Sequence, residues 1–400
     1  MKKVISVVLV VLMVAGCFSA FTACKKKQDA KVIKIGLIAP LTGAVAVYGT
    51  SVEKGVKMAV EEINANSALL GGFTIELVEK DSVGDVNTAV AAMNALIDAG
   101  IHAVVGPVIT GTTSAATSVA NENEIVMVTP SATGDKITTA SDYVFRSCFK
   151  NSYQGAMAAQ YAKKLGKTEV AAMYALDSDY STGVYNAFKA ECEKLGITVK
   201  VTETSPTIDK EVSFETQMQK VKEAVGADGF LFAPYYYEAI GTLIVPQARA
   251  AGFRGIIMGA DGYDGVQDYM KKDQLASYDN VYFTNHYSAE SSDEKVVNFI
   301  SGYKAKYGEN PTAFSALAYD AMYMLAAAVE KALGGGEDAG VLTGAAIKAA
   351  LDGSSVSGVT GNFKLDETGT PVKDVVIMKY QYNAATAAVE LKYVETLKAN

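Results

Sequence analysis

Histidine and cysteine are scarce in this chain, and their scarcity argues against metal chemistry. The 400 residues include two histidines, His102 and His286, and four cysteines. The sequence has no CxxC or HExxH pattern, and no cysteine lies near either histidine. Zinc sites in proteins are built largely from clustered cysteine and histidine ligands. We therefore expect no structural or catalytic metal site.

Sequence signatures of common catalytic sites are also absent. There is no GxSxG nucleophile turn, no GxxxxGK[ST] phosphate loop, no GxGxxG after the first predicted strand and no histidine pair suited to base catalysis. These patterns carry the nucleophile, the phosphate cradle or the dinucleotide turn of their enzyme classes. The sequence therefore favours a protein that is not an enzyme and that needs no cofactor.

Long apolar runs are missing except at the amino terminus. The run from Val4 to Ala15 follows Lys2 and Lys3, and it has the length of a signal-peptide core rather than of a spanning helix. No later stretch approaches 18 unbroken apolar residues. We expect an exported chain whose body does not cross a membrane.

Two cysteines end patterns that look like the bacterial lipobox, in which the cysteine is acylated after cleavage just before it. Residues after Cys17 are still apolar, whereas Cys24 is followed by the charged run Lys25-Lys26-Lys27-Gln28-Asp29. We prefer Cys24 as the lipidation site, with Cys17 as the alternative. Residues 1–23 are then a lipoprotein signal peptide, 24–31 a tether, and the protein an extracytoplasmic lipoprotein of the cell membrane.

Charge and size describe the mature chain further. Cleavage removes Lys2 and Lys3 and no acidic residue, which moves the formal charge from −8 to −10. An acidic surface argues against nucleic acid as the partner and leaves the lipid anchor as the membrane contact. The remaining length suits two domains rather than one core. Spacing does not decide whether Cys148 and Cys192 form a disulfide, and we favour free, buried thiols.

Short apolar runs alternate with helical patterns along most of the chain. In the first half, strands are predicted at 32–38, 73–78, 101–105 and 125–128, and helices at 48–66, 86–99 and 112–123. The rhythm restarts, with strands at 170–176, 197–201, 230–232 and 256–258 and helices at 154–165, 182–195, 214–225 and 238–251. Strands separated by single helices imply parallel pairing with right-handed crossovers. The fold class is therefore α/β with two doubly wound, Rossmann-like lobes.

The carboxyl-terminal part breaks this rhythm. Helices are predicted at 295–307, 314–333 and 344–351, followed by antiparallel strands at 359–365, 375–380 and 389–393. A tail that returns to either lobe would cross between them several times and form a multi-strand hinge. We assign 32–148 with 285–357 to the first lobe, and 149–284 with 358–400 to the second.

Candidate binding residues follow the predicted strands, where open α/β sheets bind their ligands. The first lobe offers hydroxyls and backbone N–H groups after three strands, at 39–43, 106–114 and 129–133. Such groups receive anions, although a hydroxyl at Thr112 or Thr113 could equally cap a helix. The second lobe offers Tyr180, the run Tyr235 to Tyr237, and Asp261 at its strand ends. A carboxylate and aromatic rings facing uncharged anion acceptors suit a zwitterion with an apolar side chain.

At this point the chain resembles a known family, from about Lys34 to its carboxyl terminus. The resemblance is carried by Ile35-Gly36, Pro40-Leu41-Thr42-Gly43, Tyr48-Gly49, Val104-Val105-Gly106, Met127 to Thr133, Phe145-Arg146, Gln154-Gly155, Gln247 to Gly252 and Met258 to Gly262. In this order they resemble the leucine/isoleucine/valine-binding proteins, type I periplasmic solute receptors of branched-chain amino-acid ABC importers. The resemblance implies the type I periplasmic-binding-protein fold.

The resemblance also implies roles for seven residues. Hydroxyls after the third and fourth strands would hold the ligand's α-carboxylate and part of its ammonium. An acidic residue would neutralise the ammonium, and aromatic residues from both lobes would surround the side chain. The matching positions are Thr110, Ser131, Thr133, Asp261, Tyr48, Tyr180 and Tyr236. Tyr236 needs one inserted residue before Gln247, so Tyr235 and Tyr237 stay as alternatives.

Three positions depart from the family pattern. Asp261 stands where well-known members carry glutamate, Ser82 and Ile109 replace a cysteine pair, and Pro107-Val108-Ile109 changes the residues beside the carboxylate site. Specificity for leucine, isoleucine or valine therefore does not carry over from the resemblance.

The sequence and the resemblance together predict a binding protein that closes on an aliphatic amino acid or a close analogue, with a branched-chain amino acid favoured, and delivers it to ABC permease subunits. Two alternatives share the fold. One is a receptor for another small solute, such as an amide, urea or a nucleoside. The other is a sensor subunit, which neighbouring permease and ATPase genes would argue against.

Overall fold

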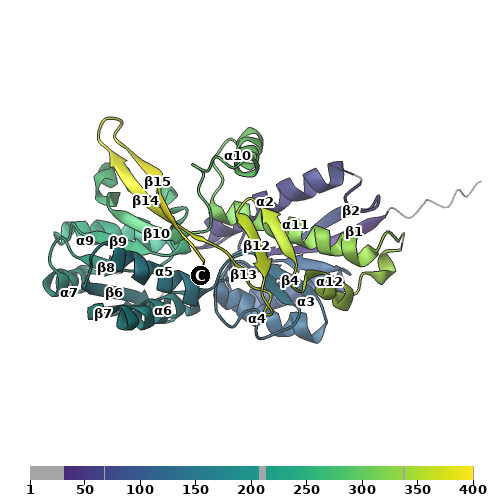
Figure 1. Ribbon diagram of the computed structural model, residues 1–400, viewed down its shortest axis with the longest axis horizontal. Helices are drawn as coiled ribbons and strands as arrows, with labels where there is room; N and C mark the ends of the chain where they lie inside the picture. The colour runs from purple at the N-terminus through teal and green to yellow at the C-terminus, as the bar shows by residue number, and fades with distance from the viewer. Residues whose placement is uncertain (1–30, 67, 207–212, 337, 400) are drawn as a thin grey trace, which may run out of the picture.

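The computed structural model describes residues 31–66, 68–206, 213–336 and 338–399. Figure 1 shows two lobes side by side, each built around a twisted sheet with helices packed on its faces. The predicted signal peptide and both lipobox cysteines, Cys17 and Cys24, lie outside the described residues. Among the described residues, no helix has both the length and the apolar character needed to span a bilayer.

Lobe 1 contains a five-stranded sheet in the order β2-β1-β3-β4-β5, in which every pair is parallel. Its strands are β1 (Val32–Ala39), β2 (Thr74–Asp81), β3 (Ala103–Val105), β4 (Val126–Thr129) and β5 (Val144–Arg146). The helices α2 (Ala46–Ala65), α3 (Val86–Asp98) and α4 (Thr110–Glu122) connect the first four strands. Strands β3 and β4 are buried along their whole length, which explains their unbroken apolar sequences.

Lobe 2 contains a seven-stranded sheet in the order β15-β14-β10-β9-β8-β6-β7. Five strands are parallel: β6 (Glu169–Ala175), β7 (Thr198–Ser205), β8 (Phe230–Phe232), β9 (Ile256–Gly259) and β10 (Val281–Asn285). The antiparallel hairpin of β14 (Val375–Asn383) and β15 (Ala388–Leu397) completes one edge. This hairpin is the long yellow ribbon beside β10 (Figure 1).

The helices of lobe 2 alternate along the chain with its strands β6 to β9. They are α5 (Asn151–Lys164), α6 (Asp179–Leu195), α7 (Glu215–Val225), and a continuous helix made of α8 (Tyr237–Ala239), a π-turn (Ile240–Ile244) and α9 (Val245–Ala250). Short 3-10 turns follow β9 at Asp261–Tyr263, Val266–Tyr269 and Lys272–Tyr278. The first of these turns carries Asp261 directly off the end of β9.

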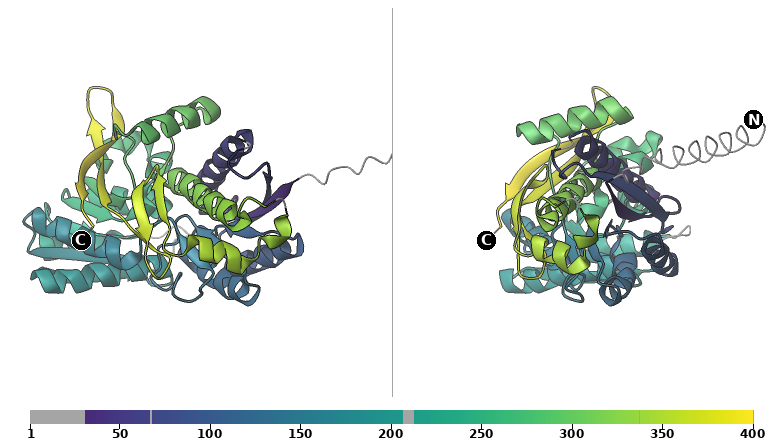
Figure 2. Two further views of the ribbon diagram at one scale, coloured as in Figure 1. Left: turned by 45° about the vertical axis from the view of Figure 1, so that its right-hand side comes forward. Right: turned by 90° about the vertical axis from the view of Figure 1, so that its right-hand side faces the viewer.

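The chain then returns to lobe 1. Helices α10 (Glu294–Tyr307), α11 (Ala313–Leu333) and α12 (Gly344–Leu351) lie beside the lobe 1 elements in both views of Figure 2. Helix α11 packs closely on α2 at Gly55. A Cβ atom added at this glycine would lie 2.2 Å from the Ser315 carbonyl oxygen, so there is no room for a side chain. A small antiparallel sheet follows, formed by β11 (Ser355–Gly358), β12 (Gly361–Leu365) and β13 (Pro371–Val372).

Three crossings connect the lobes. They run from β5 to α5, from β10 to α10, and from β13 to β14 through Lys373 and Asp374. The sequence-based boundary at 357/358 falls inside β11, whose partner is β12. Strands β12 and β13 stay with lobe 1, since the Arg146 backbone N–H donates to the Gly369 carbonyl at 3.1 Å. The third crossing therefore lies at 373–374, about fifteen residues later than that boundary.

The predicted fold class, α/β with two doubly wound parallel-sheet lobes, is confirmed. The predicted antiparallel pairing of the last two strands is also present, as β14 and β15. Cys148 and Cys192 are both free and buried, as we favoured. In the part of the chain that the structure describes, no group of three or more His, Cys, Asp or Glu side chains is arranged to hold a metal ion.

Candidate functional site

Six of the seven predicted site residues line one cavity between the lobes. Its walls are Tyr48, Val108, Ile109, Thr110, Ser131, Tyr180, Tyr236, Asp261, Gly262 and Phe314. The seventh predicted residue, Thr133, is fully buried two residues beyond Ser131 and does not line the cavity. Strand ends of both sheets therefore meet at this place, as expected for open α/β sheets.

The lobe 1 wall is shaped by the turn after β3. Gly106 has a φ of +105°, and an added Cβ would lie 2.1 Å from the Ile38 carbonyl oxygen, so glycine is required there. The turn leads to Thr110, the first residue of α4. A helix start with free backbone N–H groups attracts anions. Loop residues after β3 and β4 are thus brought together at the start of α4.

The hydroxyls on this wall differ in whether they already have partners. The Oγ1 atoms of Thr110 and Thr133 are buried and have no hydrogen-bond partner in the part of the chain that the structure describes. Ser131 Oγ donates to the Val108 carbonyl at 2.8 Å and keeps its lone pairs. The hydroxyls of Thr112 and Thr113 both donate to the Ile109 carbonyl, so neither caps the helix nor faces the cavity. A buried polar atom without a partner is costly and points to something that binds there.

Asp261 is the acidic centre of the lobe 2 wall. The carboxylate is held on both oxygens, since the Tyr180 hydroxyl donates to Oδ1 at 2.9 Å and His286 Nε2 lies 3.2 Å from Oδ2. Its backbone N–H donates to Gln154 Oε1 at 3.3 Å. The side chain is 3% exposed. Asp261 is therefore rigidly placed and almost completely dehydrated.

The charge on Asp261 is not balanced by a protein cation. Burial lowers the pKa of His286 to about 4, against the opposing pull of its hydrogen bond to Asp261, so the imidazole is neutral at pH 7. No lysine or arginine among the described residues forms an ion pair with Asp261. Because buried charges are normally paired, the site needs a positive group from elsewhere.

Aromatic rings form the rest of the wall. The rings of Tyr180 and Tyr236 stack with centroids 5.1 Å apart, and Tyr48 stacks on Phe314 at 4.3 Å. Tyr48 also meets the edge of Tyr236 at 5.6 Å. Rings from both lobes thus surround an apolar space beside the carboxylate.

The neighbours of Tyr236 have other contacts. The hydroxyl of Tyr235 lies 2.9 Å from Ser205 Oγ inside lobe 2. The hydroxyl of Tyr237 donates to the Ala44 carbonyl of lobe 1 at 2.8 Å. Of the three consecutive tyrosines, only Tyr236 lines the cavity, in agreement with the position that the resemblance favoured.

The lobes touch each other across the site. The Tyr48 hydroxyl donates to the Gly262 carbonyl at 2.6 Å and accepts from the Tyr237 backbone N–H at 3.1 Å. Asp264 Oδ2 accepts from the Ala313 backbone N–H, at the start of α11, at 2.7 Å. The cavity volume is about 10 Å³, room for one water molecule. This is a closed arrangement, and a larger ligand requires the walls to separate.

Sequence reasoning missed several residues of this site. His286 follows β10, a strand that the alternating pattern did not reveal, and Phe314 lies at the start of a helix rather than after a strand. The signal for His286 was its place after the run Val281–Asn285, which ends at the same sheet edge as β9. Phe314 had no signal beyond being an aromatic residue near a helix start.

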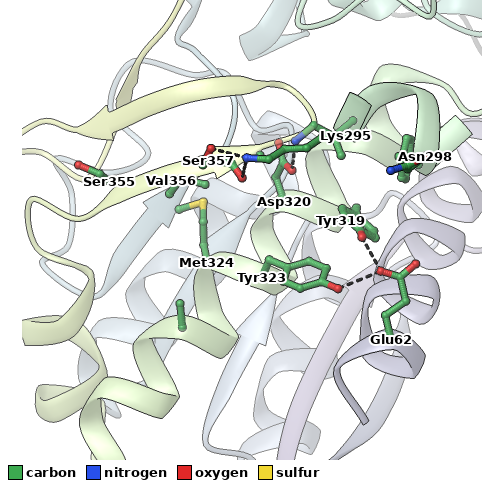
Figure 3. A pocket seen from close by; sticks show the side chains of 14 residues that line it. Glu62, Lys295, Asn298, Tyr319, Asp320, Tyr323, Met324, Ser355, Val356 and Ser357 are labelled. Carbon is green, nitrogen blue, oxygen red and sulfur yellow. Dashed lines mark hydrogen bonds between the residues drawn. The ribbon is translucent and has the colours of Figure 1, made fainter. Parts of the chain in front are cut away.

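A larger hollow lies elsewhere on lobe 1, between α2, α10, α11 and β11 (Figure 3). Its volume is about 520 Å³. Glu62 accepts hydrogen bonds there from the hydroxyls of Tyr319 and Tyr323, and Lys295 donates to the carbonyl of Ser357. Each charged group in this hollow already has polar partners. The cavity between the lobes differs, because its carboxylate has no cationic partner and some of its hydroxyls have no hydrogen-bond partner among the described residues.

Known proteins are similar to this chain both in sequence and in fold. The family model described as periplasmic binding protein matches residues 32–386. The Leu/Ile/Val-binding protein homolog 3 of Brucella melitensis is 33% identical over 338 residues, covering 84% of this chain and 88% of that protein. The Leu/Ile/Val-binding protein BraC3 of Rhizobium johnstonii is 34% identical over 340 residues, covering 84% and 88%.

Solved structures agree. The leucine-binding protein of Thermotoga maritima superposes with a TM-score of 0.80 at 28% identity, covering 92% of this chain and 99% of that one. The branched-chain amino-acid substrate-binding protein of Streptococcus pneumoniae, in complex with isoleucine, gives 0.79 at 31% identity, covering 91% and 99%. All four are named as binding proteins, and the matching family is described as periplasmic binding protein. From sequence and fold alike, the chain belongs to the Leu/Ile/Val-binding protein family of periplasmic solute-binding proteins.

Proposed function

We propose that this protein is a lipid-anchored receptor that binds a branched-chain amino acid between its lobes and delivers it to an ABC importer. One observation carries the proposal: a buried carboxylate without a protein cation, Asp261, faces buried hydroxyls without partners on the other lobe. A zwitterion supplies what both walls lack. The relatives named above, which bind leucine, isoleucine or valine by name, support the same ligand class.

The ligand's ammonium group would pair with Asp261. A cation next to this carboxylate would balance its negative charge, which is buried because the Asp261 side chain is 3% exposed. An anionic or neutral ligand would leave that charge buried and unpaired, which is costly. This requirement disfavours urea, amides and simple carboxylic acids as cargo.

The ligand's carboxylate would lie at the start of α4. Thr110, Ser131 and Thr133 offer hydroxyls there, and the first N–H groups of the helix face the same region. Hydrogen bonds to a charged group contribute about 1.5–3 kcal/mol each. The Thr110 and Thr133 hydroxyls, which have no partner among the described residues, would gain hydrogen bonds from this contact.

The aliphatic side chain would lie against Tyr48, Tyr236 and Phe314. Burying a leucine-sized side chain is worth about 1.5–3 kcal/mol. Together with paired charges this is compatible with micromolar binding, which needs about −8 kcal/mol. Aromatic walls favour an apolar side chain, such as that of leucine, isoleucine or valine, over a polar one.

The two groups of contacts lie on different lobes, so a ligand held by both draws the lobes together. We take this closure, about the crossings at 147–150, 286–293 and 373–374, as the signal that an importer recognises. Acylation at Cys24 would keep the receptor beside the permease subunits. These two elements, the anchor and the importer, complete the proposal.

Calorimetry on the purified, unacylated chain tests the ligand assignment. Dialysed protein is titrated with L-leucine, L-isoleucine and L-valine, and in parallel with acetamide, urea and adenosine. We expect micromolar or tighter binding of at least one branched-chain amino acid and no measurable heat from the three neutral solutes. Binding of a neutral solute with no response to the amino acids would refute the proposal.

A further inference from the structure

The neutral histidine behind Asp261 lies where the ligand site meets the hinge. His286 follows β10 and begins the second crossing, and its ring stacks on Phe149 of the first crossing with centroids 3.7 Å apart and planes 22° apart. Its side chain is 1% exposed. The stack leaves the ring little freedom, so Nε2 is fixed toward Asp261 Oδ2 at 3.2 Å.

The hydrogen-bond partners of the His286 ring determine which of its nitrogens carries the proton. Nδ1 is buried and has no hydrogen-bond partner among the described residues. A neutral imidazole carries one proton, and only Nε2 has an acceptor, so the Nε2–H tautomer donates to the Asp261 carboxylate. His286 also lines a hollow of about 640 Å³ that includes Lys373 and Asp374 of the third crossing.

The charged and titratable groups around the ring explain its neutrality. Asp261 attracts a second proton, while burial and the nearby Lys373 on the third crossing oppose it. Cys148 and Tyr180 also lie near the Asp261 carboxylate, and burial raises the pKa of both, so both stay protonated and neutral. Asp264 adds a second carboxyl nearby, and burial raises its pKa to about 6. Lys373 is the one cation among these groups, and it lines the hollow at the hinge rather than the cavity between the lobes.

We propose that His286 is a positioning residue for the ligand's ammonium: its neutral imidazole fixes the Asp261 carboxylate by a hydrogen bond and leaves the negative charge for the ligand. This inference rests on the proposed function and goes beyond it, because it assigns ammonium selectivity to a residue that does not line the cavity. A cation at position 286 would satisfy Asp261 internally. The site would then no longer need an ammonium group.

The test uses a pair of probes that differ only at the ammonium. L-leucine carries the group, and 4-methylpentanoate has the same side chain and carboxylate without it. Calorimetry at pH 7 gives the ratio of the two affinities for wild type and for His286→Gln, His286→Leu and His286→Lys. The other histidine supplies a matched control, His102→Gln, since its Nδ1 contacts the Lys34 backbone on an edge of lobe 1.

Each variant has a distinct expected result. His286→Leu should lose about tenfold or more in leucine affinity while 4-methylpentanoate binding stays within about threefold, because only leucine depends on the held carboxylate. His286→Gln keeps a neutral donor and should restore most of the wild-type ratio. His286→Lys should lower the ratio at least about thirtyfold. His102→Gln should leave the ratio unchanged.

Two outcomes would overturn the inference, and they are distinguishable. If wild type binds leucine and folded His286→Leu keeps the wild-type ratio within threefold, His286 does not position the carboxylate, while the proposed function stands. If wild type binds none of the branched-chain amino acids, the proposed function fails and the inference fails with it. Should His286→Lys not fold, as circular dichroism will show, the Leu and Gln variants still decide.

Discussion

Asp261→Asn is the sharpest single test of the site, because it removes a charge and almost no volume. In the wild-type fold the carboxylate accepts from Tyr180 and His286. An asparagine can keep both contacts: its oxygen accepts from Tyr180, and its amide donates to Nε2 of the other imidazole tautomer. The fold should therefore survive, and the loss should fall on the ligand.

The size of that loss follows from burial. The ligand's ammonium would lie opposite a neutral amide in a site that is 2% exposed at residue 261. Truncating one partner of a buried charge pair costs about 2–5 kcal/mol. This corresponds to a drop in leucine affinity of about thirtyfold to several thousandfold. Calorimetry against leucine measures it directly, with the melting temperature recorded to confirm folding.

The chain supplies a matched control three residues away. Asp264 is equally buried, but it binds the Ala313 backbone and Asn285 and does not line the cavity. Asp264→Asn should keep leucine affinity within about threefold, whatever it does to stability. If Asp261→Asn binds leucine within a factor of two of wild type, Asp261 does not pair with the ammonium, and the reasoning from the uncompensated charge is refuted.

Four further predictions follow from other parts of the chain. Thr110→Val and Thr133→Val should each weaken leucine binding about tenfold without lowering the melting temperature, because these hydroxyls have no partner in the closed fold; a variant that melts lower while its affinity is unchanged would contradict this. Cys24→Ser should move the protein from the membrane fraction to the soluble fraction, since stable anchoring needs the acyl chains. Membrane attachment lost in Cys17→Ser instead would identify the other lipobox. Burial lowers the pKa of His286 below its usual 6.5, to about 4, so the unfolded chain binds its proton first; its contribution to the free energy of unfolding is complete above pH 6.5 and is lost at about 1.4 kcal/mol per pH unit down to about 4. Urea melts of wild type and His286→Gln at pH 7 and 5 should show a smaller pH dependence in the variant, and equal dependence would argue against a neutral buried ring. Small-angle scattering should give a smaller radius of gyration with saturating leucine than without it, and an unchanged curve with binding confirmed would count against hinge closure.

The fold could be predicted well where each strand is followed by a helix. Periodicity identified β1 to β4 and β6 to β9, because buried parallel strands are short apolar runs and the helices between them are amphipathic. It failed at β10, β5 and β11. Strand β10 ends in Thr284 and Asn285, whose polar side chains are buried by pairing with neighbours instead of facing solvent. Because these polar side chains are buried by hydrogen bonds to residues far away in the sequence, the strand has no continuous apolar run that periodicity could detect.

The candidate site could be predicted in part for the same reason. Thr110, Ser131 and Asp261 follow recognised strands, so the strand-end rule and the family resemblance placed them together. His286 follows an unrecognised strand, and its partner Phe149 lies on a different crossing. Contacts between crossings depend on how the lobes are joined, and local sequence does not contain that information. The small sheet shows the same limit, since its pairing decided where the third crossing lies.

The closed arrangement of the lobes affects the apparent affinity for the ligand. Tyr180 donates to Asp261 the kind of hydrogen bond that a ligand ammonium would donate, and Tyr48 already joins the lobes through Gly262. With a cavity of about 10 Å³, leucine cannot enter without breaking such contacts. The apparent affinity is therefore the intrinsic affinity reduced by the fraction of molecules that are open. The ligand has an advantage in charge over these contacts. The Tyr180 hydroxyl donates a hydrogen bond to Asp261 but leaves the carboxylate charge unbalanced, whereas an ammonium group would donate a hydrogen bond and also balance the charge. The same unpaired charge on Asp261 thus makes the closed site selective for an amino acid, whose ammonium group can balance it.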